Sequence, residues 1–453
     1  MKVILIFPRF KYRSGDPPLG IAYVASYLRA HLNVDLSIID TTFIPSFEYV
    51  KTVLEKENPD IIGIYFDTLM FHDGLKIANI AKKLGIFVVA GGPHATIMPE
   101  TLIDKVDAVV IGEGEITFKE VVENYPKLES VKGIWYRKGK KIFKNLSRQP
   151  IENLDELPPP ARDLLPIKNY IANWHLLDSI DPNLLGTNIV ASRGCPFNCS
   201  FCQPTLRIMF GNKVRRRDAN EIIKEIKDVK EKYGVSAIFF HDDTFTANRD
   251  WVIEFCNSLK QENLDIIWGC NSRVNTLDKE LMEIMYSAGC REFHLGVESS
   301  SQRILDDIYH KGIKVEDARR ITTLAKSIGI HTLCFFMIGA PTETEKEINE
   351  MIKFACSLDT DEITVSITTP LPKTQLYDIV KQNYKISENF ADFDYYSSRA
   401  FEDKNLNFKR LKYLQRKALL MFYLHPKHLS YLLKHMSSIK GMHKMITKIR
   451  RFV

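Results

Sequence analysis

The sequence predicts an α/β protein with two parallel-sheet domains: a doubly wound, Rossmann-like sheet, then a partial (β/α)6 TIM barrel. A small, mostly helical region follows them. The main observation is that short apolar runs alternate with helix-length segments over residues 1–145 and again over residues 186–375. Such alternation is typical of strands that pair in parallel. A proline-rich connector separates the two series within residues 146–185, and helical patterns continue over residues 376–453.

Length and composition agree with a soluble protein of several domains. The chain has 453 residues, of which 45% are hydrophobic and 26% charged, and this is enough to form two or three cores. No apolar run reaches 18 residues, so the sequence predicts no transmembrane helix. Residues 1–8 are too short for a signal peptide and have the pattern of a strand. None of the eight Cys residues precedes Cys195, which argues against disulfides and for a reducing, cytoplasmic location.

In the first series, the ends of the strands carry the candidate binding residues. A doubly wound sheet binds its ligand outside the carboxyl ends of its strands. Two of these ends hold paired glycines, in the segments 91–94 (G-G-P-H) and 112–115 (G-E-G-E), and glycine lets a ligand approach the backbone closely. No G-x-G-x-x-G follows the first strand, which disfavours a dinucleotide. The predicted strands are 3–7, 36–39, 61–65, 87–90 and 108–111, and the predicted helices are 21–32, 47–57, 74–84 and 117–124.

The second series predicts the barrel. Gly234, Gly289 and Gly329 stand where helices are expected to end, because glycine readily adopts the left-handed conformation of a helix C-terminus. In barrels of this kind the chemistry lies at the C-terminal ends of the strands. The predicted strands are 188–192, 237–241, 266–271, 292–296, 332–337 and 363–367, and the predicted helices are 219–233, 251–263, 279–288, 315–327 and 343–357.

Three cysteines follow the first predicted barrel strand. Cys195, Cys199 and Cys202 have the spacing C-x3-C-x2-C, which lets three thiolates converge on one metal centre. A closed zinc site needs four protein ligands, and no fourth Cys or His lies nearby in the sequence. Thiolate ligation is usual for iron–sulfur clusters, and a cluster held by three thiolates keeps one iron open for a substrate. The pattern therefore favours a cluster over a structural zinc loop.

This spacing, with aromatic residues between the cysteines, resembles the signature of the radical S-adenosylmethionine (SAM) superfamily. With the G-G-P-H and G-E-G-E loops ahead of it, most of the chain resembles the cobalamin (B12)-dependent radical SAM family, class B methyltransferase type. The resemblance implies that the three cysteines are the catalytic ligands of a [4Fe-4S] cluster whose open iron binds SAM. The motifs G-V-E-S and G-A-P-T-E are similar to SAM-binding turns of the family. The expected SAM contacts are Phe201, Asp242, Asp243, Arg273, Glu298, Gly339 and Pro341.

Several polar residues near these motifs are open to more than one role. The adjacent Asp242 and Asp243 either contact the ribose or ammonium group of SAM or cap the next helix. Arg273 is suited to bind a carboxylate with both arms of its guanidinium. The basic run at residues 213–217 is either a solvated surface or a site for a cofactor phosphate, a reductase or an acidic substrate.

The same resemblance implies that the first domain binds cobalamin at its strand ends. The D-x-H-x-x-G pattern, whose His ligates cobalt in other cobalamin proteins, is absent, because Met70 stands two residues before His72. Many members of the resembled family also lack this His, and the loop 67–71 is then the expected floor for the corrin ring. The expected cobalamin contacts are Pro8, Leu19, Gly20, Asp67, Thr68, Leu69, Gly91, Gly92, Pro93, His94, Gly112, Glu113, Gly114 and Glu115.

The activity implied by the resemblance is methylation of an unactivated carbon, through a 5′-deoxyadenosyl radical and methylcobalamin. Two alternatives stay open: a cyclase or rearrangement enzyme with the same cofactors, and a non-catalytic cofactor-binding or assembly protein. A methylthiotransferase is disfavoured, because its second cluster would need cysteines before Cys195. The substrate, which is a small molecule, a lipid or a protein side chain, is not identified. An electron donor such as ferredoxin or flavodoxin is expected.

The C-terminal region is basic. Of the 62 Lys and Arg residues, 12 lie within residues 405–453, which contain no Asp or Glu, so the rest of the chain is mildly acidic. Apolar residues at helical spacing over 406–423 and 429–435 predict amphipathic helices. These helices either cap the barrel with solvated cations or contact an acidic partner or an anionic membrane surface. Elsewhere the organised basic surface is too small to predict nucleic-acid binding.

Overall fold

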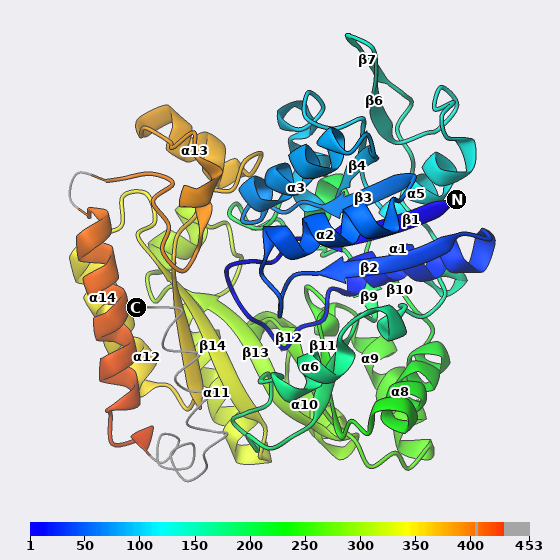
Figure 1. The fold of residues 1–453 in the computed structure, drawn as a ribbon. Coiled ribbons are helices and arrows are strands. Elements are labelled where there is room, and N and C mark those ends of the chain that lie inside the picture. Colours follow the sequence, from blue (N-terminus) through cyan, green and yellow to red (C-terminus); the bar gives the residue numbers. More distant parts are fainter. Residues whose placement is uncertain (404–405, 430–453) are drawn as a thin grey trace. The chain divides into compact units, whose positions relative to one another are not determined.

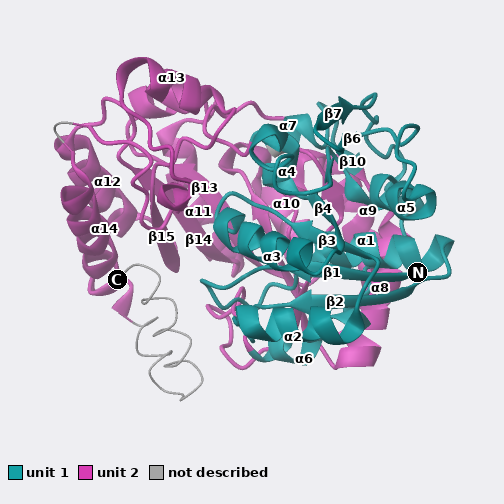
Figure 2. Ribbon diagram, turned by 45° about the horizontal axis from the view of Figure 1, so that its top comes forward, with its two compact units in different colours: residues 1–172, 204–215 teal, residues 173–203, 216–453 magenta. Residues whose placement is uncertain are grey.

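The computed structural model describes residues 1–403 and 406–429 (Figure 1). Internal contacts group the chain into two compact units (Figure 2). Unit 1 comprises residues 1–172 and 204–215, and unit 2 comprises residues 173–203 and the described residues from 216 onward. The segment that follows Cys202 in the chain therefore belongs to unit 1. The domain boundaries at residues 145, 185 and 375 stay predictions.

Unit 1 is built on a seven-stranded sheet with the strand order β2-β1-β3-β4-β5-β6-β7. Its first five strands are parallel. Most of them are near-continuous apolar runs, because both faces of such a sheet are covered. The chain reverses direction across the sheet between β1 and β3, which is where a doubly wound sheet opens for a ligand. The five parallel strands are β1 (Lys2–Phe7), β2 (Asp35–Asp40), β3 (Ile61–Tyr65), β4 (Phe87–Gly91) and β5 (Ala108–Val110).

The helices of unit 1 form two pairs. α1 (Leu19–His31) contacts α5 (Gly114–Asn124), and α2 (Phe47–Glu57) contacts α3 (Phe71–Lys83). Right-handed crossovers place helices on opposite faces when the chain runs in opposite directions across a sheet. Local signals fix the ends of these helices; at α2, for example, the Ser46 side chain accepts a hydrogen bond of 3.1 Å from the Tyr49 N–H.

The sheet ends in an antiparallel hairpin that the sequence did not predict. β6 (Ile134–Lys138) pairs antiparallel with β5, and β7 (Lys141–Lys144) pairs antiparallel with β6. All four residues of β7 are exposed, so this strand lacks the buried apolar run that identified the parallel strands. Its lysines are typical of an edge strand that does not pair further.

Unit 2 contains six parallel strands in the order β8-β11-β12-β13-β14-β15, which confirms the predicted partial barrel. Gly234 and Gly329 end helices α8 and α11 in the left-handed conformation, as predicted. The strands are β8 (Gly186–Ile189), β11 (Ala237–Phe240), β12 (Ile267–Ser272), β13 (Cys290–Glu298), β14 (His331–Ile338) and β15 (Glu362–Ile367), and the helices between them are α8 (Ala219–Tyr233), α9 (Arg249–Gln261), α10 (Lys279–Ser287), α11 (Val315–Ile328) and α12 (Glu345–Ser357).

Short elements occupy the predicted connector and the start of unit 2. Two 3₁₀ turns, Leu154–Glu156 and Arg162–Leu164, precede α6 (Ile167–Ala172) where an extended segment was expected. Trp174 is buried and donates a hydrogen bond of 2.9 Å to the Asn188 side chain. A Cβ atom at Gly186 would lie only 2.3 Å from the Trp174 ring. Trp174 is therefore a core residue of unit 2.

The described C-terminal region is mostly helical. α13 (Gln375–Asn383) is followed by α14 (Phe408–Tyr423), which packs on α12 and β15. The apolar face of α14, including Leu411, Leu414 and Phe422, is buried. Most of the predicted helix at 429–435 lies outside the described residues. Within the residues that the structure describes, no helix is long and apolar enough to cross a membrane.

Candidate functional site

The three cysteines lie on the loop that follows β8 in unit 2. All three thiols are free and partly exposed. Two backbone hydrogen bonds at Ser200 hold the loop. The Ser200 N–H donates to the Tyr309 carbonyl at 2.9 Å, and the Leu376 N–H donates to the Ser200 carbonyl at 2.9 Å. These contacts fix the middle of the cysteine loop to unit 2.

The donor set of this loop fits a thiolate-bound cluster. Burial, together with the nearby Cys199, Asp243 and Cys195, raises the pKa of Cys202 to about 12, so metal binding must release a proton from this thiol. Among the residues that the structure describes, no three His, Cys, Asp or Glu side chains form a ready-made metal site. The thiols would therefore draw together on the metal. Three neighbouring thiols without a fourth ligand suit a cluster with one open iron and not a closed zinc site.

Arg273 follows β12 and contacts the cysteine loop directly. Its Nη1 donates to the Cys199 Sγ at 3.1 Å, and its guanidinium carbon lies 3.8 Å from the centre of the Phe197 ring. Its Nε donates to the Asn275 side chain at 3.2 Å, and its Nη2 donates to the Lys311 carbonyl. The side chain that was expected to bind SAM thus holds the loop of the cluster ligands.

Asp242 and Asp243 follow β11. The Asp242 carboxylate is buried and accepts hydrogen bonds from the Ala191 N–H at 3.2 Å and the Ser192 hydroxyl at 2.5 Å. Burial raises the pKa of Asp242 to about 6. Burial and the charge of Asp242 raise the pKa of Asp243 to about 7. Asp242 therefore anchors the chain that leads into the cysteine loop, while Asp243 has the position of a ligand contact.

Glu298 ends β13 next to a buried lysine that the sequence analysis missed. The Lys311 Nζ donates to the Glu298 Oε1 at 2.8 Å, and both side chains are at least 90% buried. Lys311 also lies 5.6 Å from the centre of the Phe201 ring in the cysteine loop. Glu298 has a φ of 68° beside a shift in the register between β13 and β14. Such backbone strain is typical of functional sites.

The turn after β14 is held by its own glutamate. The buried Glu343 accepts hydrogen bonds from the Gly339 N–H at 2.6 Å and the Ala340 N–H at 3.1 Å. Burial raises the pKa of Glu343 to about 8. Gly339 has a φ of 79°, which favours glycine. The G-A-P-T-E motif thus forms a closed turn at the end of its strand.

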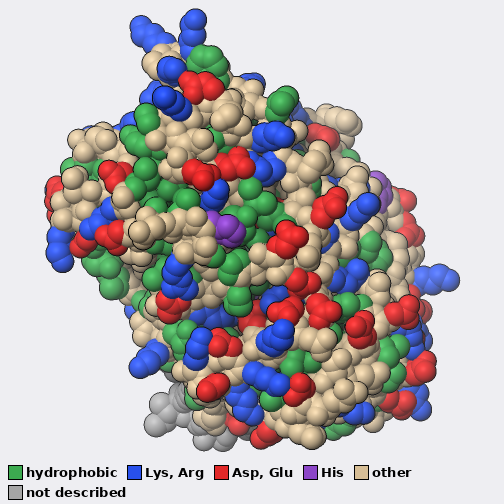
Figure 3. Space-filling view, turned by 90° about the vertical axis from the view of Figure 1, so that its right-hand side faces the viewer, with side chains coloured by type: hydrophobic (Ala, Val, Ile, Leu, Met, Phe, Trp, Pro, Cys, Tyr) green, Lys and Arg blue, Asp and Glu red, His purple; other side chains and the backbone are tan. Residues whose placement is uncertain are grey.

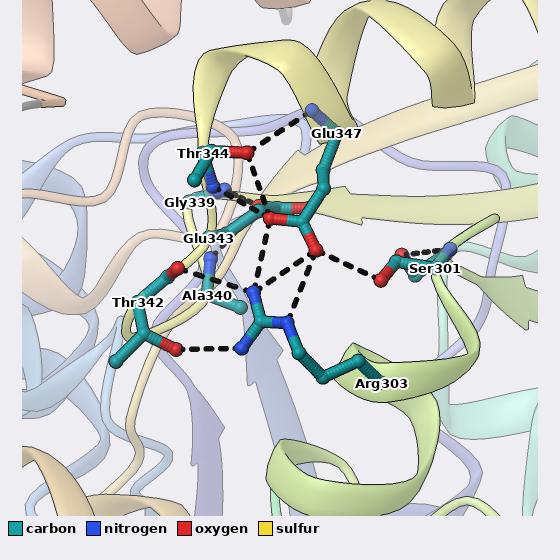
Figure 4. A network of polar contacts seen from close by, with 9 residues as sticks. Ser301, Arg303, Gly339, Ala340, Thr342, Glu343, Thr344 and Glu347 are labelled. Carbon is teal, nitrogen blue, oxygen red and sulfur yellow. Dashed lines mark hydrogen bonds and ion pairs between the residues drawn. The ribbon is translucent and has the colours of Figure 1, made fainter.

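A polar network supports this turn (Figure 4). The Arg303 guanidinium pairs with Glu347 at 2.9 Å and donates to the Thr342 hydroxyl at 3.0 Å. Burial acts to raise the pKa of Glu347, but hydrogen bonds from Thr344, Ser301 and Arg303 lower it to about 2. Glu347 therefore stays ionised and keeps the turn fixed to the first turn of α12.

In unit 1 the predicted binding loops follow β1, β3, β4 and β5, and so share one edge of the parallel sheet. Gly92 adopts φ 98° and ψ −173°, and a Cβ there would lie 2.9 Å from the Phe66 carbonyl oxygen. The Thr96 hydroxyl donates to the Gly92 carbonyl at 2.9 Å and accepts from the Gly112 N–H at 3.2 Å. Thr96, which was not predicted, thus joins the two glycine loops.

The His94 side chain is fully buried among the loops of this edge and is not exposed on its surface. Its Nδ1 is 3.1 Å from the Thr68 hydroxyl, and its Nε2 is 3.2 Å from the Thr101 hydroxyl. Burial lowers the pKa of His94 to about 4. The neutral ring therefore ties the loop after β3 to the turn after α4 (Pro93–Ile97). Direct contact of His94 with cobalamin stays a prediction.

Acidic residues of this edge are also internal. The Asp67 side chain accepts a hydrogen bond of 2.7 Å from the Met70 N–H, which shapes the predicted corrin floor, and burial raises the pKa of Asp67. Glu113 is buried, accepts from the Ile151 N–H at 2.6 Å and pairs with Arg215 at 2.9 Å. Glu115 and Leu19 are buried as well, whereas Gly20 is exposed.

The basic run at 213–217 is not simply a solvated surface. Arg215 forms the buried pair with Glu113, and Arg217 forms a buried pair of 2.5 Å with Glu225. These charges are therefore neutralised within the protein. On the face of the molecule in Figure 3, Lys and Arg side chains are intermingled with Asp and Glu.

Comparison with known proteins agrees with this division of sites. The family model of the B12 binding domain matches residues 11–122, and the model of the radical SAM superfamily matches residues 189–355. An uncharacterized methyltransferase of Pyrococcus horikoshii is 37% identical over 443 residues, which cover 94% of this chain and 93% of the relative. The chain belongs to the cobalamin-dependent radical SAM family. An anaerobic magnesium-protoporphyrin IX monomethyl ester cyclase of Rubrivivax gelatinosus is 30% identical, covering 85% of this chain and 72% of the cyclase.

Solved structures of cobalamin-dependent radical SAM proteins share the fold. The radical SAM methyltransferase TsrM from Kitasatospora setae, with cobalamin and a [4Fe-4S] cluster bound, matches with a TM-score of 0.70 and 17% identity, covering 84% of this chain and 78% of TsrM. The radical enzyme OxsB matches with a TM-score of 0.75 and 16% identity, covering 98% of this chain and 71% of OxsB. These structures confirm the predicted fold class. The two family models and the Pyrococcus horikoshii relative confirm the predicted family and its cofactors, namely cobalamin, a [4Fe-4S] cluster and SAM, and the chain is a radical SAM enzyme.

Several functional candidates of this radical SAM enzyme had no signal in the sequence. Arg303 immediately precedes a π-helix, Ile304–Ile308, and Lys311 follows it; both lie between two regular elements, β13 and α11. Their partners, Glu347 and Glu298, are identified only by the folded structure. A lysine is rarely buried unless it is paired, so nothing in the sequence pointed to Lys311.

Proposed function

We propose that this protein transfers a methyl group to an unactivated carbon, as a cobalamin-dependent radical SAM C-methyltransferase. The observation that carries the proposal is the loop of three thiols without a fourth ligand, at the strand ends of unit 2. It occurs in a chain whose unit 1 contains the B12 binding domain. When bound, the cluster would supply the electron that cleaves SAM, and cobalamin would supply the methyl group.

The residues of unit 2 would hold and orient the cluster and SAM. Cys195, Cys199 and Cys202 would ligate the cluster. Asp243 and Glu298 would contact polar groups of SAM, and the turn that begins at Gly339 would hold its adenine. Phe201 and Pro341 are the other proposed SAM contacts, whereas Asp242 and Arg273, which were also expected to contact SAM, would hold the cysteine loop.

The residues of unit 1 would hold cobalamin mainly through loop backbone. Gly91, Gly92 and Gly112 leave room for close approach, and the Asp67 loop would lie beneath the corrin ring. The side chains of His94 and Glu113 would act indirectly, by fixing the shape of these loops. The remaining proposed contacts are Pro8, Leu19, Gly20, Thr68, Leu69, Pro93, Gly114 and Glu115.

A second candidate is a radical cyclization without methyl transfer. It is favoured by the 30% identity to the Rubrivivax gelatinosus cyclase, which this chain matches over 72% of that protein. The two candidates need the same cofactors and differ in the product, because only methyl transfer adds 14 Da.

The test uses the full chain, reconstituted anaerobically with iron, sulfide and cobalamin. SAM and dithionite are then added, and 5′-deoxyadenosine and S-adenosylhomocysteine are quantified. Methyl transfer from SAM predicts that both products form, whereas cyclization predicts 5′-deoxyadenosine without S-adenosylhomocysteine. A reconstituted protein that shows no corrinoid absorbance would contradict the proposal. A substrate of any class, and a ferredoxin or flavodoxin as donor, can then be screened by the 14 Da gain.

A further inference from the structure

Arg273 is a buried cation whose charge no carboxylate neutralises. Only 5% of the residue is exposed, and none of the described residues places a carboxylate within ion-pair distance of its guanidinium. By contrast, the comparably buried Lys311, Arg215 and Arg217 each pair with a glutamate. A buried charge is costly unless an opposite charge approaches it. Arg273 is therefore placed to face an anion that the bound state supplies.

The contacts of Arg273 identify that anion. Its Nη1 points at the Cys199 sulfur from 3.1 Å, while Phe197 covers one face of the guanidinium at 3.8 Å. Its other two nitrogens are engaged by Asn275 and by the Lys311 carbonyl. A bidentate clamp on the SAM carboxylate would have to compete with these contacts. The Cys199 sulfur, a proposed ligand of the cluster, already contacts the guanidinium.

We propose that Arg273 tunes the cluster through Cys199: its N–H···S bond and its unpaired charge raise the reduction potential of the cluster. The inference rests on the proposed function, in which Cys199 ligates the cluster. Reduction adds one electron, supplied by the reductant, and so makes the cluster more negative. Hydrogen bonds to the sulfurs and the surrounding net charge set such potentials, and the low exposure of Arg273 strengthens its effect. Arg273 is thus a positioning residue, which acts on the chemistry through Cys199.

The test is a redox titration of the reconstituted full chain without SAM, followed by the EPR signal of the reduced cluster. Arg273→Gln removes the charge, and we expect it to make the cluster about tenfold harder to reduce, a fall of about 59 mV for one electron. Arg273→Lys keeps the charge but loses the planar fork, so its fall should be smaller. Arg291→Gln is the matched control, because Arg291 also stacks on an aromatic ring, Tyr286 at 4.1 Å, but stands at the N-terminal end of β13, whereas the cysteine loop lies at the C-terminal ends of the strands.

The outcomes separate the possible roles of Arg273. A midpoint equal to that of the wild type in Arg273→Gln, with a full complement of iron, would overturn the proposal. A loss of SAM affinity with an unchanged midpoint would also overturn it, in favour of a carboxylate clamp. Should Arg273→Gln fail to take up the cluster, Arg273→Lys is measured in its place. A midpoint below that of the wild type would then support the proposal, and a midpoint equal to that of the wild type would overturn it. A wild-type protein that forms no cluster would instead contradict the proposed function.

Discussion

The strand ends of unit 1 and of unit 2 differ in the groups that they offer to a ligand. In unit 1 the predicted ligand edge presents glycines and backbone, and its titratable side chains are turned inward. His94 bonds two hydroxyls, and Glu113 pairs with Arg215. In unit 2 the corresponding ends gather buried charges around the cysteine loop, namely Arg273 and the Glu298–Lys311 pair.

This difference follows from what each edge has to do. A large, preformed cofactor can be held by shape and backbone contacts, so charges at its edge are needed only to fix the loops. A cluster that accepts an electron responds to every nearby charge, because electrostatic interactions are strong where water is excluded. On this contrast, the buried charges of unit 2 serve the chemistry at the cysteine loop, whereas those of unit 1 fix the shape of the ligand loops.

The largest effect is expected from Cys199→Ala. Loss of one thiolate ligand should abolish 5′-deoxyadenosine formation, while cobalamin binding, measured by corrinoid absorbance, should stay close to wild type. Cys356→Ala is the matched control, because Cys356 is a buried thiol of unit 2 on α12, outside the site. If Cys199→Ala lost cobalamin binding as well as 5′-deoxyadenosine formation, the strand ends of unit 1 and of unit 2 would not be separate sites.

Lys311→Met should give the next largest effect. It leaves the Glu298 carboxylate buried without its cation, which costs about 3–5 kcal/mol of unfolding free energy. Urea unfolding followed by tryptophan fluorescence reports mainly on unit 2, which holds Trp174, Trp251 and Trp268.

Two further variants make this measurement specific. The double variant Glu298→Gln/Lys311→Met should regain much of the loss, because it removes both charges. Lys227→Met breaks a half-exposed pair of unit 2 with Glu262 and should cost much less than Lys311→Met, because exposed ion pairs contribute little to stability. Equal costs for Lys311→Met and Lys227→Met would refute the contrast between buried and exposed charges.

The sequence predicted best what depends on local pattern. Among the residues that the structure describes, the apolar runs located the eleven parallel strands of the two large sheets within a few residues, because a covered parallel sheet demands continuous apolar segments. The loops after these strands were also found, since parallel strands end at one edge. The exposed β7 gave no such signal and was missed.

The contacts of individual side chains were beyond the sequence, because their partners lie far along the chain. Arg215 pairs with Glu113, 102 residues earlier, so a run that looked like a basic surface is partly buried. Arg273 was expected to bind SAM, but the folded chain places Cys199, 74 residues away, against its guanidinium. Charge and spacing indicate that a residue is chemically useful, and only packing shows what it faces.

Gly92→Ala tests the role of backbone shape in unit 1. A φ of 98° with ψ −173° is open almost only to glycine, and the new Cβ would press on the Phe66 carbonyl at 2.9 Å. Strain of this kind costs about 1–3 kcal/mol, and cobalamin affinity should fall with it. Gly20→Ala is the control for stability, because a Cβ there meets nothing within 4 Å. A Gly92→Ala protein with wild-type stability and cobalamin affinity would contradict the assigned role.

The smallest effect is a pH dependence that His94 gives to unit 1. Its folded pKa, about 4, lies below the ordinary value of 6.5, so the unfolded chain binds the proton more tightly. The contribution of the neutral His94 ring to the free energy of unfolding is complete above pH 6.5 and is lost as the pH falls towards 4. At pH 5.5 the loss amounts to about 1.4 kcal/mol. His94→Gln cannot titrate, so its unfolding free energy should fall less steeply between pH 6.5 and 4 than that of the wild type. Identical slopes for wild type and His94→Gln would show that the ring is not held neutral between Thr68 and Thr101, and the unit 1 edge would then carry a charge of its own.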